Sequence, residues 1–225
     1  MDNIINDFID NGFLDFYLDE KQKNFFREIV KNINKGKLYN SMFHGLHHSQ
    51  KVLLFAYLIG LQENLDEVDM QIIVDAAVYH DIGRTDDSND SFHGLYGANK
   101  IDKVVTGDIY KEQENLNILK GIIDAHSQDN KLEIIAINHD VENIERFMKL
   151  ATILKDADAL DRTRFMKTSK ATLKENFIIS DYSKTLIPLA CEINSYYRLR
   201  ICEINYQRLQ NTVGEEEIEC SHGIG

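Results

Sequence analysis

Residues 65–83, with the sequence LDEVDMQIIVDAAVYHDIG, indicate the fold class of the whole chain. Their apolar members recur at steps of three and four residues, which is the spacing of one face of an α-helix. The apolar face leads directly to His80 and Asp81, and Gly83 then supplies a residue at which helices commonly stop. This stretch therefore predicts a helix that carries a His-Asp pair at its C-terminal end.

Helical spacing of apolar residues continues through most of the remaining chain. The sequence has a single proline, Pro188, and few runs that alternate as β-strands do. We therefore predict an all-α fold. The stretch from Arg84 to Asn99 is an exception, because its Asp, Ser, Asn and Gly residues compete for backbone hydrogen bonds and predict a loop beside the His-Asp pair.

Length and composition restrict the class of protein. A chain of 225 residues can bury the core of one domain, or of one domain with an appendage, which argues against two independent domains. The formal net charge of −12 repels nucleic-acid backbones and anionic membranes, so we expect neither a nucleic-acid duplex nor a membrane as partner. The three cysteines are widely spaced, the N-terminus lacks a basic and apolar leader, and no run approaches roughly 20 apolar residues. These features favour a cytoplasmic protein with reduced thiols.

Further histidine and aspartate side chains share helical faces with apolar residues. His48 and Asp158 each lie in register with the apolar positions of a predicted helix, so both point inward. A buried carboxylate is costly unless it finds a partner, and a cation would satisfy it. Imidazole nitrogens and carboxylate oxygens suit divalent transition metals, so a helical bundle could bring these two residues to His80 and Asp81 around one ion.

Three strings carry a resemblance to a known family. FHGLHHSQKV at 43–52, YHDIGR at 79–84 and KDADALDR at 155–162, in this order, resemble the HD superfamily of metal-dependent phosphohydrolases. The resemblance implies an HD-domain helical bundle with a metal site in the bundle core. It places the metal ligands on His48, His80, Asp81 and Asp158.

The resemblance covers part of the chain, a motif-bearing core from about 40 to 165. We predict a single HD domain over residues 1–225, in which flanking helices occupy 1–39 and 166–212. A frayed tail is predicted at 213–225.

Some branches of the superfamily hold a second metal, and the resemblance places its ligands on His93 in FHGLYGA and His126 in IIDAHSQD. Asp81 would then bridge two ions roughly 3.5–4 Å apart, and a hydroxide held between them would be the nucleophile. The predicted cofactor is one or two divalent ions, with Mn, Fe, Co, Ni, Zn and Mg as candidates. Taken alone, His93 could be a loop residue and His126 a helix-end cation.

The resemblance also implies catalytic roles for Asp81 and for His44, which matches a proton-donating histidine of the cyclic-nucleotide phosphodiesterase branch. Taken alone, His44 could be a hydrogen-bonded core residue. Cations close in sequence to the proposed ligands are predicted to hold substrate phosphate, namely Arg84, Lys155, Arg162 and Arg164. We thus expect a metal-dependent phosphohydrolase that cleaves a phosphoester or phosphoanhydride of a small molecule, with nucleotides as the leading candidates.

Several other residues have structural interpretations. A second pair, His139-Asp140, begins a helical run instead of ending one, and it predicts a helix boundary with Asp140 as the cap. Asp156 and Asp161 are interpreted as solvent-facing carboxylates or as carboxylates that orient a ligand histidine. The basic and aromatic patch at 196–200 is typical of a solvated face or of a subunit contact in a homodimer.

Two alternative functions remain open. The same order of His, His-Asp, His, His and Asp resembles an oxygenase branch similar to myo-inositol oxygenase, in which two irons activate dioxygen. A metal-stabilised binding or signalling module, whose ions only bridge helices, is the second alternative.

Overall fold

The computed structural model describes residues 4–128, 132–165 and 177–220, with side chains to residue 207. All regular secondary structure in these ranges is helical and none of it is strand, which confirms the all-α class. The part of the predicted C-terminal helical region that falls at 166–176 lies outside the described residues.

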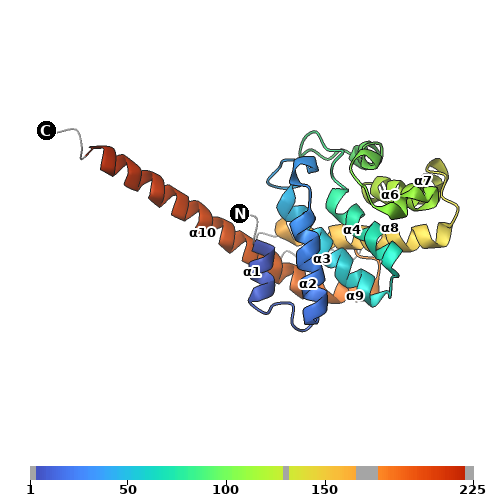
Figure 1. Ribbon diagram of the computed structural model, residues 1–225, viewed down its shortest axis with the longest axis horizontal. Coiled ribbons are helices and arrows are strands. Elements are labelled where there is room, and N and C mark those ends of the chain that lie inside the picture. The colour runs from blue at the N-terminus through green and yellow to red at the C-terminus, as the bar shows by residue number, and fades with distance from the viewer. Residues whose placement is uncertain (1–3, 129–131, 166–176, 221–225) are drawn as a thin grey trace.

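Central helices that pack against one another (Figure 1) are α3 (Leu46–Gln62), α4 (Glu67–Tyr79), α6 (Gln113–His126) and α8 (Ile144–Asp161). α3 is buried along most of its length because apolar residues occupy all of its faces between Val52 and Gly60. The side chain of Asp66 caps α4 by accepting a hydrogen bond from the backbone N–H of Asp69. These helices carry most of the predicted ligands into the centre of the molecule.

Further helices lie outside this centre, namely α1 (Ile4–Asp10), α2 (Glu20–Asn32), α9 (Asp181–Thr185) and α10 (Ile187–Cys220). α10 contacts α1 and α8 and then extends away from the other helices (Figure 1). Its backbone is helical to Cys220, so residues 213–220 continue a helix where the sequence predicts a tail. A run of glutamates in this stretch explains the difference, because Glu has good intrinsic helix propensity.

Short elements complete the described fold: α5 (His93–Ala98), α7 (Leu132–Asn138), η1 (Lys35–Lys37), η2 (Ile101–Lys103), η3 (Asp108–Lys111) and η4 (Arg162–Phe165). α5 corrects the prediction of a continuous loop from Arg84 to Asn99, since only residues 84–92 and the turn residue Asn99 of that stretch lie outside a helix. The helix packs against α6, and Gly94 permits the contact because a Cβ there would lie 2.7 Å from two backbone oxygens of α6. Gly94 therefore weakens the helical pattern in the sequence, but it allows α5 and α6 to pack closely in the fold.

The second His-Asp pair does not supply the predicted cap. α8 begins after Asn143, whose side chain accepts a hydrogen bond from the backbone N–H of Arg146. Asp140 lies earlier, in the turn after α7, and has a positive φ of 52°, a conformation that Asp tolerates better than most residues. His139 Nε2 lies 3.0 Å from Asp124 Oδ2, so this histidine links the end of α7 to α6.

One cluster of buried apolar side chains runs through the described residues, from Ile4 in α1 to Tyr197 in α10. It includes residues of all the central helices, so the ligand-bearing segments are held by a common core. Within the described ranges, every helix is too short or too polar to cross a membrane.

Candidate metal centre

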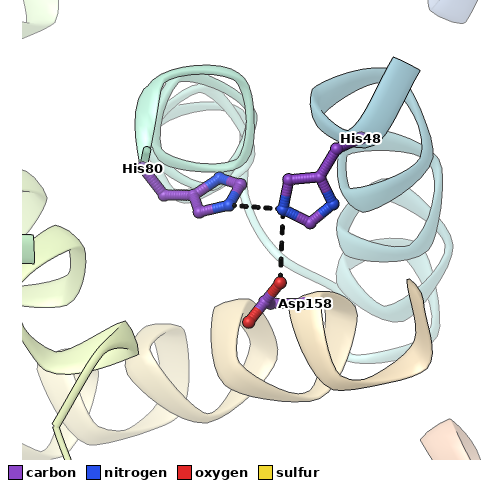
Figure 2. A group of neighbouring side chains, drawn as sticks. All are labelled: His48, His80 and Asp158. Atoms are coloured by element: carbon purple, nitrogen blue, oxygen red, sulfur yellow. Dashed lines mark hydrogen bonds and ion pairs between the residues drawn. The ribbon is translucent and has the colours of Figure 1, made fainter. Parts of the chain in front are cut away.

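The first group of predicted ligands meets at one place, and Figure 2 shows three of them, His48, His80 and Asp158. His48 lies in the first turn of α3, His80 and Asp81 directly follow α4, and Asp158 lies in the last turn of α8. His48 Nε2 lies 3.0 Å from His80 Nε2, and 3.4 Å from both Asp81 Oδ2 and Asp158 Oδ1. The convergence that a shared ion requires is therefore present in the fold.

His93 and His126 lie on the other side of Asp81. They are the first residue of α5 and the last residue of α6. Their Nε2 atoms are 2.9 Å apart and lie 3.2 and 3.6 Å from Asp81 Oδ1. The carboxylate of Asp81 thus faces His48 and His80 with one oxygen and the second histidine pair with the other.

Each of these four histidine rings has its Nδ1 held by an oxygen. The acceptors are the carboxylate of Asp161 for His48, and the backbone carbonyls of Ala77, Asp90 and Ile123 for His80, His93 and His126. Carboxylate and carbonyl oxygens only accept hydrogen bonds, so each Nδ1 carries the hydrogen and a neutral ring has its lone pair on Nε2. Metal-ligating histidines are oriented by this kind of contact.

Without a cation this arrangement is electrostatically unfavourable. Two pairs of Nε2 lone pairs face each other at 3.0 and 2.9 Å, and like partial charges at this distance repel. Asp81 Oδ2 is buried beside the first pair and accepts no hydrogen bond from any described residue. An unsatisfied buried oxygen is costly, so a bound cation would remove both penalties.

The separations also fit a divalent metal. Ligand atoms about 2.0–2.2 Å from a common ion lie about 2.8–3.6 Å apart at octahedral or tetrahedral angles. The separations between histidine nitrogens and carboxylate oxygens are 3.2–3.6 Å, close to this range. Two ligand sets have all their donor atoms within 4.8 Å of one another, namely His48, His80 and Asp158, and His80, Asp81 and His126.

The pKa shifts of Asp81 and His126 favour the protonation states that bind metal. Burial by itself would raise the pKa of Asp81, but the neighbouring imidazoles of His80, His126 and His48 hold that pKa well below its usual range. Burial lowers the pKa of His126 to about 4, so this imidazole is neutral near neutral pH. Anionic carboxylates and neutral imidazoles are the forms that bind divalent metals.

A family model of the HD domain matches residues 45–163, more than half of the chain. The chain belongs to the HD domain family. This result confirms the resemblance carried by the three sequence strings, and the HD domain match contains the whole six-residue cluster. HD domains are mostly metal-dependent phosphohydrolases, which indicates hydrolase chemistry and divalent metal at the level of the superfamily. No significant match was found among curated proteins or among solved structures.

Asp161 lies directly behind the HD domain cluster. It is completely buried, and its carboxylate accepts hydrogen bonds from His48 Nδ1 at 2.7 Å and Arg164 Nη1 at 2.7 Å, while Lys51 Nζ lies 2.8 Å away. Of the two interpretations of Asp161, the structure shows the one in which it orients a ligand histidine. Sequence reasoning missed Lys51, although its position three residues after His48 on the same helical face is a usable signal.

For Asp156, the structure shows neither of the two predicted roles, a solvent-facing carboxylate or one that orients a ligand histidine. It is fully buried and does not face solvent, and its carboxylate accepts hydrogen bonds from the backbone N–H groups of Ile179 and Ser180 at 2.7 and 2.9 Å. It precedes Asp158 by two residues, and positions two apart on a helix point in different directions. Asp156 therefore holds the segment before α9 and contacts no ligand histidine.

Two of the predicted phosphate-binding cations lie beside the HD domain cluster. Arg84 Nε donates to Asp81 Oδ1 at 2.7 Å, and Arg84 Nη2 lies 3.2 Å from His93 Nε2. Arg164 reaches the cluster through Asp161. Arg84 therefore contacts a candidate ligand directly, and Arg164 is separated from His48 by the side chain of Asp161.

The other two predicted cations point elsewhere. Lys155 Nζ donates to the backbone oxygens of Ala125 at 3.1 Å and Gln128 at 2.5 Å, where it caps the C-terminal end of α6. Arg162 is exposed, and its guanidinium lies 5.0 Å from the ring centre of Phe177. Proximity in sequence did not predict the direction of these two side chains.

His44 lies next to the ligands but is not one of them. Its ring centre is 5.8 Å from that of His48, and its Nδ1 donates to Asp87 Oδ1 at 2.7 Å. Burial lowers the pKa of His44, while the hydrogen bond to Asp87 acts in the opposite direction. Sequence reasoning missed Asp87, because that residue lies in a loop with several acidic neighbours.

Proposed function

We propose that this HD domain protein is a phosphohydrolase that uses metal-activated water to cleave a phosphoester or phosphoanhydride of a small molecule, with nucleotides as the leading candidates. The supporting observation is the arrangement of four imidazole Nε2 atoms around the two oxygens of one buried carboxylate, Asp81. Each oxygen faces two histidines, which supports a carboxylate shared between two ions. Two-metal hydrolases use a pair of ions in this way on phosphate esters.

The residues would divide into two ligand sets. His48, His80 and Asp158 would hold one ion, His93 and His126 the other, and Asp81 would contact both. Bound divalent ions supply a water of lowered pKa and withdraw charge from the phosphoryl oxygens. The carbonyls and the carboxylate that hold each Nδ1 keep the imidazoles in place before any ligand arrives, which limits reorganisation.

Substrate binding falls to the cations beside this cluster. The guanidinium of Arg84, which donates to the carboxylate of Asp81, can donate to a phosphate oxygen instead. Carboxylates and phosphates are both anions that accept two parallel hydrogen bonds from a guanidinium. Arg164, which follows the C-terminal end of α8 and bonds to Asp161, can contribute a second positive charge. His44, whose ring neighbours that of His48, would donate a proton to the oxygen that leaves.

Elemental analysis combined with a panel of phosphate monoesters, diesters and nucleotides tests this proposal. We expect bound divalent metal and phosphate release in the wild-type protein, and joint loss of both in His80→Ala and Asp81→Ala. The second His-Asp pair offers a matched control, because His139 contacts Asp124 outside the cluster. His139→Ala should keep both the metal and the activity.

Two results would contradict the proposal. Substrate-dependent oxygen uptake by iron-loaded protein, without phosphate release, would indicate an oxygenase. Stoichiometric metal without turnover of any phosphate substrate would indicate a binding module in which the ions only bridge helices.

A further inference from the structure

Two segments far apart in sequence are joined beside the metal centre by polar side chains. Ser41 lies before the turn that leads into α3, and Asp87 lies in the irregular stretch 84–92. The hydroxyl of Ser41 lies 2.6 and 2.8 Å from the two carboxylate oxygens of Asp87, and His44 Nδ1 lies 2.7 Å from Asp87 Oδ1. The carboxylate of Asp87 therefore accepts hydrogen bonds from both side chains.

Ser41 also stabilises the turn that carries His44. Its hydroxyl oxygen accepts hydrogen bonds from the backbone N–H groups of Phe43 at 2.9 Å and His44 at 3.2 Å. Serine hydroxyls stabilise turns by this local pattern. The backbone and the ring of His44 are thus restrained by one network.

This network decides which ring nitrogen of His44 is bonded to Asp87. A carboxylate only accepts hydrogen bonds, so Nδ1 carries a hydrogen toward Asp87 and Nε2 points away from it. The His44 side chain is 14% exposed and that of Asp87 is 38% exposed. The ring of His44 meets the fully enclosed ring of His48 edge to face, so it lies between the exposed carboxylate and the buried ligands.

We propose that Asp87 is a positioning residue that holds Nε2 of His44 toward the leaving group of the substrate. The inference rests on the proposed phosphohydrolase function. As the P–O bond to the leaving group breaks, its electron pair passes to the leaving oxygen, which takes the Nε2 proton of the His44 imidazolium. The phosphoryl group bonds to a water oxygen, and that water releases one proton. The ring keeps its Nδ1 hydrogen on Asp87 and regains its Nε2 proton from solvent.

Esters with different leaving groups test this role. Asp87→Ala should lower kcat for phenyl phosphate, a poor leaving group, by about 10–100-fold. It should change kcat for 4-nitrophenyl phosphate little, because nitrophenolate leaves without a proton. Asp87→Asn should retain part of the rate, since an amide oxygen still accepts the Nδ1 hydrogen bond without the charge. Bound metal should stay at the wild-type level in both variants.

Asp86→Ala is the matched control. Asp86 is an exposed aspartate of the same stretch, and its carboxylate bonds to the backbone N–H and the hydroxyl of Ser88. This variant should keep wild-type rates on both esters. An equal loss on both esters in Asp87→Ala, or no loss on either, would overturn the positioning role.

The ¹⁵N chemical shifts of the His44 ring separate failure of this inference from failure of the proposed function. In metal-free protein we expect hydrogen on Nδ1, and in Asp87→Ala a shift of the neutral ring toward the tautomer with hydrogen on Nε2. A wild-type protein that cleaves no phosphate ester would contradict the proposed function. An unchanged tautomer in Asp87→Ala would overturn the orientation of His44 by Asp87, whatever the activity.

Discussion

Asp161 shows how a side chain outside the ligand set can control the metal centre. Its charge is buried with those of Lys51 and Arg164, and it accepts the Nδ1 hydrogen of His48. Burial by itself would raise the pKa of Asp161, but Lys51 and its other neighbours lower that pKa, so the carboxylate stays ionised. An ionised partner increases the basicity of His48 and holds its Nε2 in the direction of Asp158.

We therefore expect Asp161→Asn to weaken binding of the divalent metal by about 10–100-fold. The amide keeps the size of the side chain but removes the charge that balances two buried cations. Competition with a chelating indicator measures the affinity. Asp156→Asn provides the comparison, because Asp156 is equally buried on the same helix and bonds only to backbone N–H groups. Equal affinity loss in the two variants would show that Asp161 acts through general stability.

The position of α5 depends on backbone contacts that side chains would prevent. The backbone of Gly83, which follows the His-Asp pair, lies so close to α5 that a Cβ there would be 1.9 Å from the carbonyl oxygen of His93 and 2.4 Å from Gly97 N. This close approach brings His93 Nε2 to within 3.2 Å of Asp81. The second half of the metal cluster therefore depends on how near one short helix can come to the end of α4.

Gly83→Ala should force α5 outward and destabilise the fold by about 1–3 kcal/mol, the usual cost of overpacking. We also expect less metal bound per chain, because His93 would move away from Asp81 while His48, His80 and Asp158 stay in place. Thermal unfolding and elemental analysis measure the two effects. Gly107→Ala is the control, since the nearest atoms to its Cβ would be 3.6–3.8 Å away, in ordinary contact. The explanation fails if both variants unfold at the same temperature with the same metal content.

The six candidate ligands belong to five separate segments, because α3, the end of α4, α5, α6 and α8 each contribute at least one. A bound ion would therefore link segments that the apolar core otherwise holds together. Ligands that bind only the folded state stabilise it by mass action, by about 2.7 kcal/mol when the free concentration is 100 times Kd.

Removal of metal with a chelator should accordingly lower the Tm by about 5–11 °C, since about 2–4 °C corresponds to 1 kcal/mol in a chain of this size. Addition of excess Mn²⁺ should restore the Tm. His80→Ala, which removes a ligand of the first proposed ion, should show a smaller metal-dependent shift. A chelator-induced shift of equal size in His80→Ala would place the stabilising ion elsewhere in the molecule.

The sequence by itself determined the helical class and the identity of the clustered residues. Helical periodicity is a local property, because residues three and four apart share a face whatever lies opposite them. Inward register therefore predicted that His48 and Asp158 point to the core, and the three motif strings linked them to His80 and Asp81. The family match bears out this reading of the strings.

Only the tertiary structure decided which side chains support that cluster. Lys155 and Arg162 are as close in sequence to Asp158 as Arg164 is, yet only Arg164 reaches the carboxylate behind His48. The pairing of Asp87 with His44 joins residues 43 positions apart. Such contacts depend on how helices cross and how closely their backbones approach, and spacing along one chain does not contain this information.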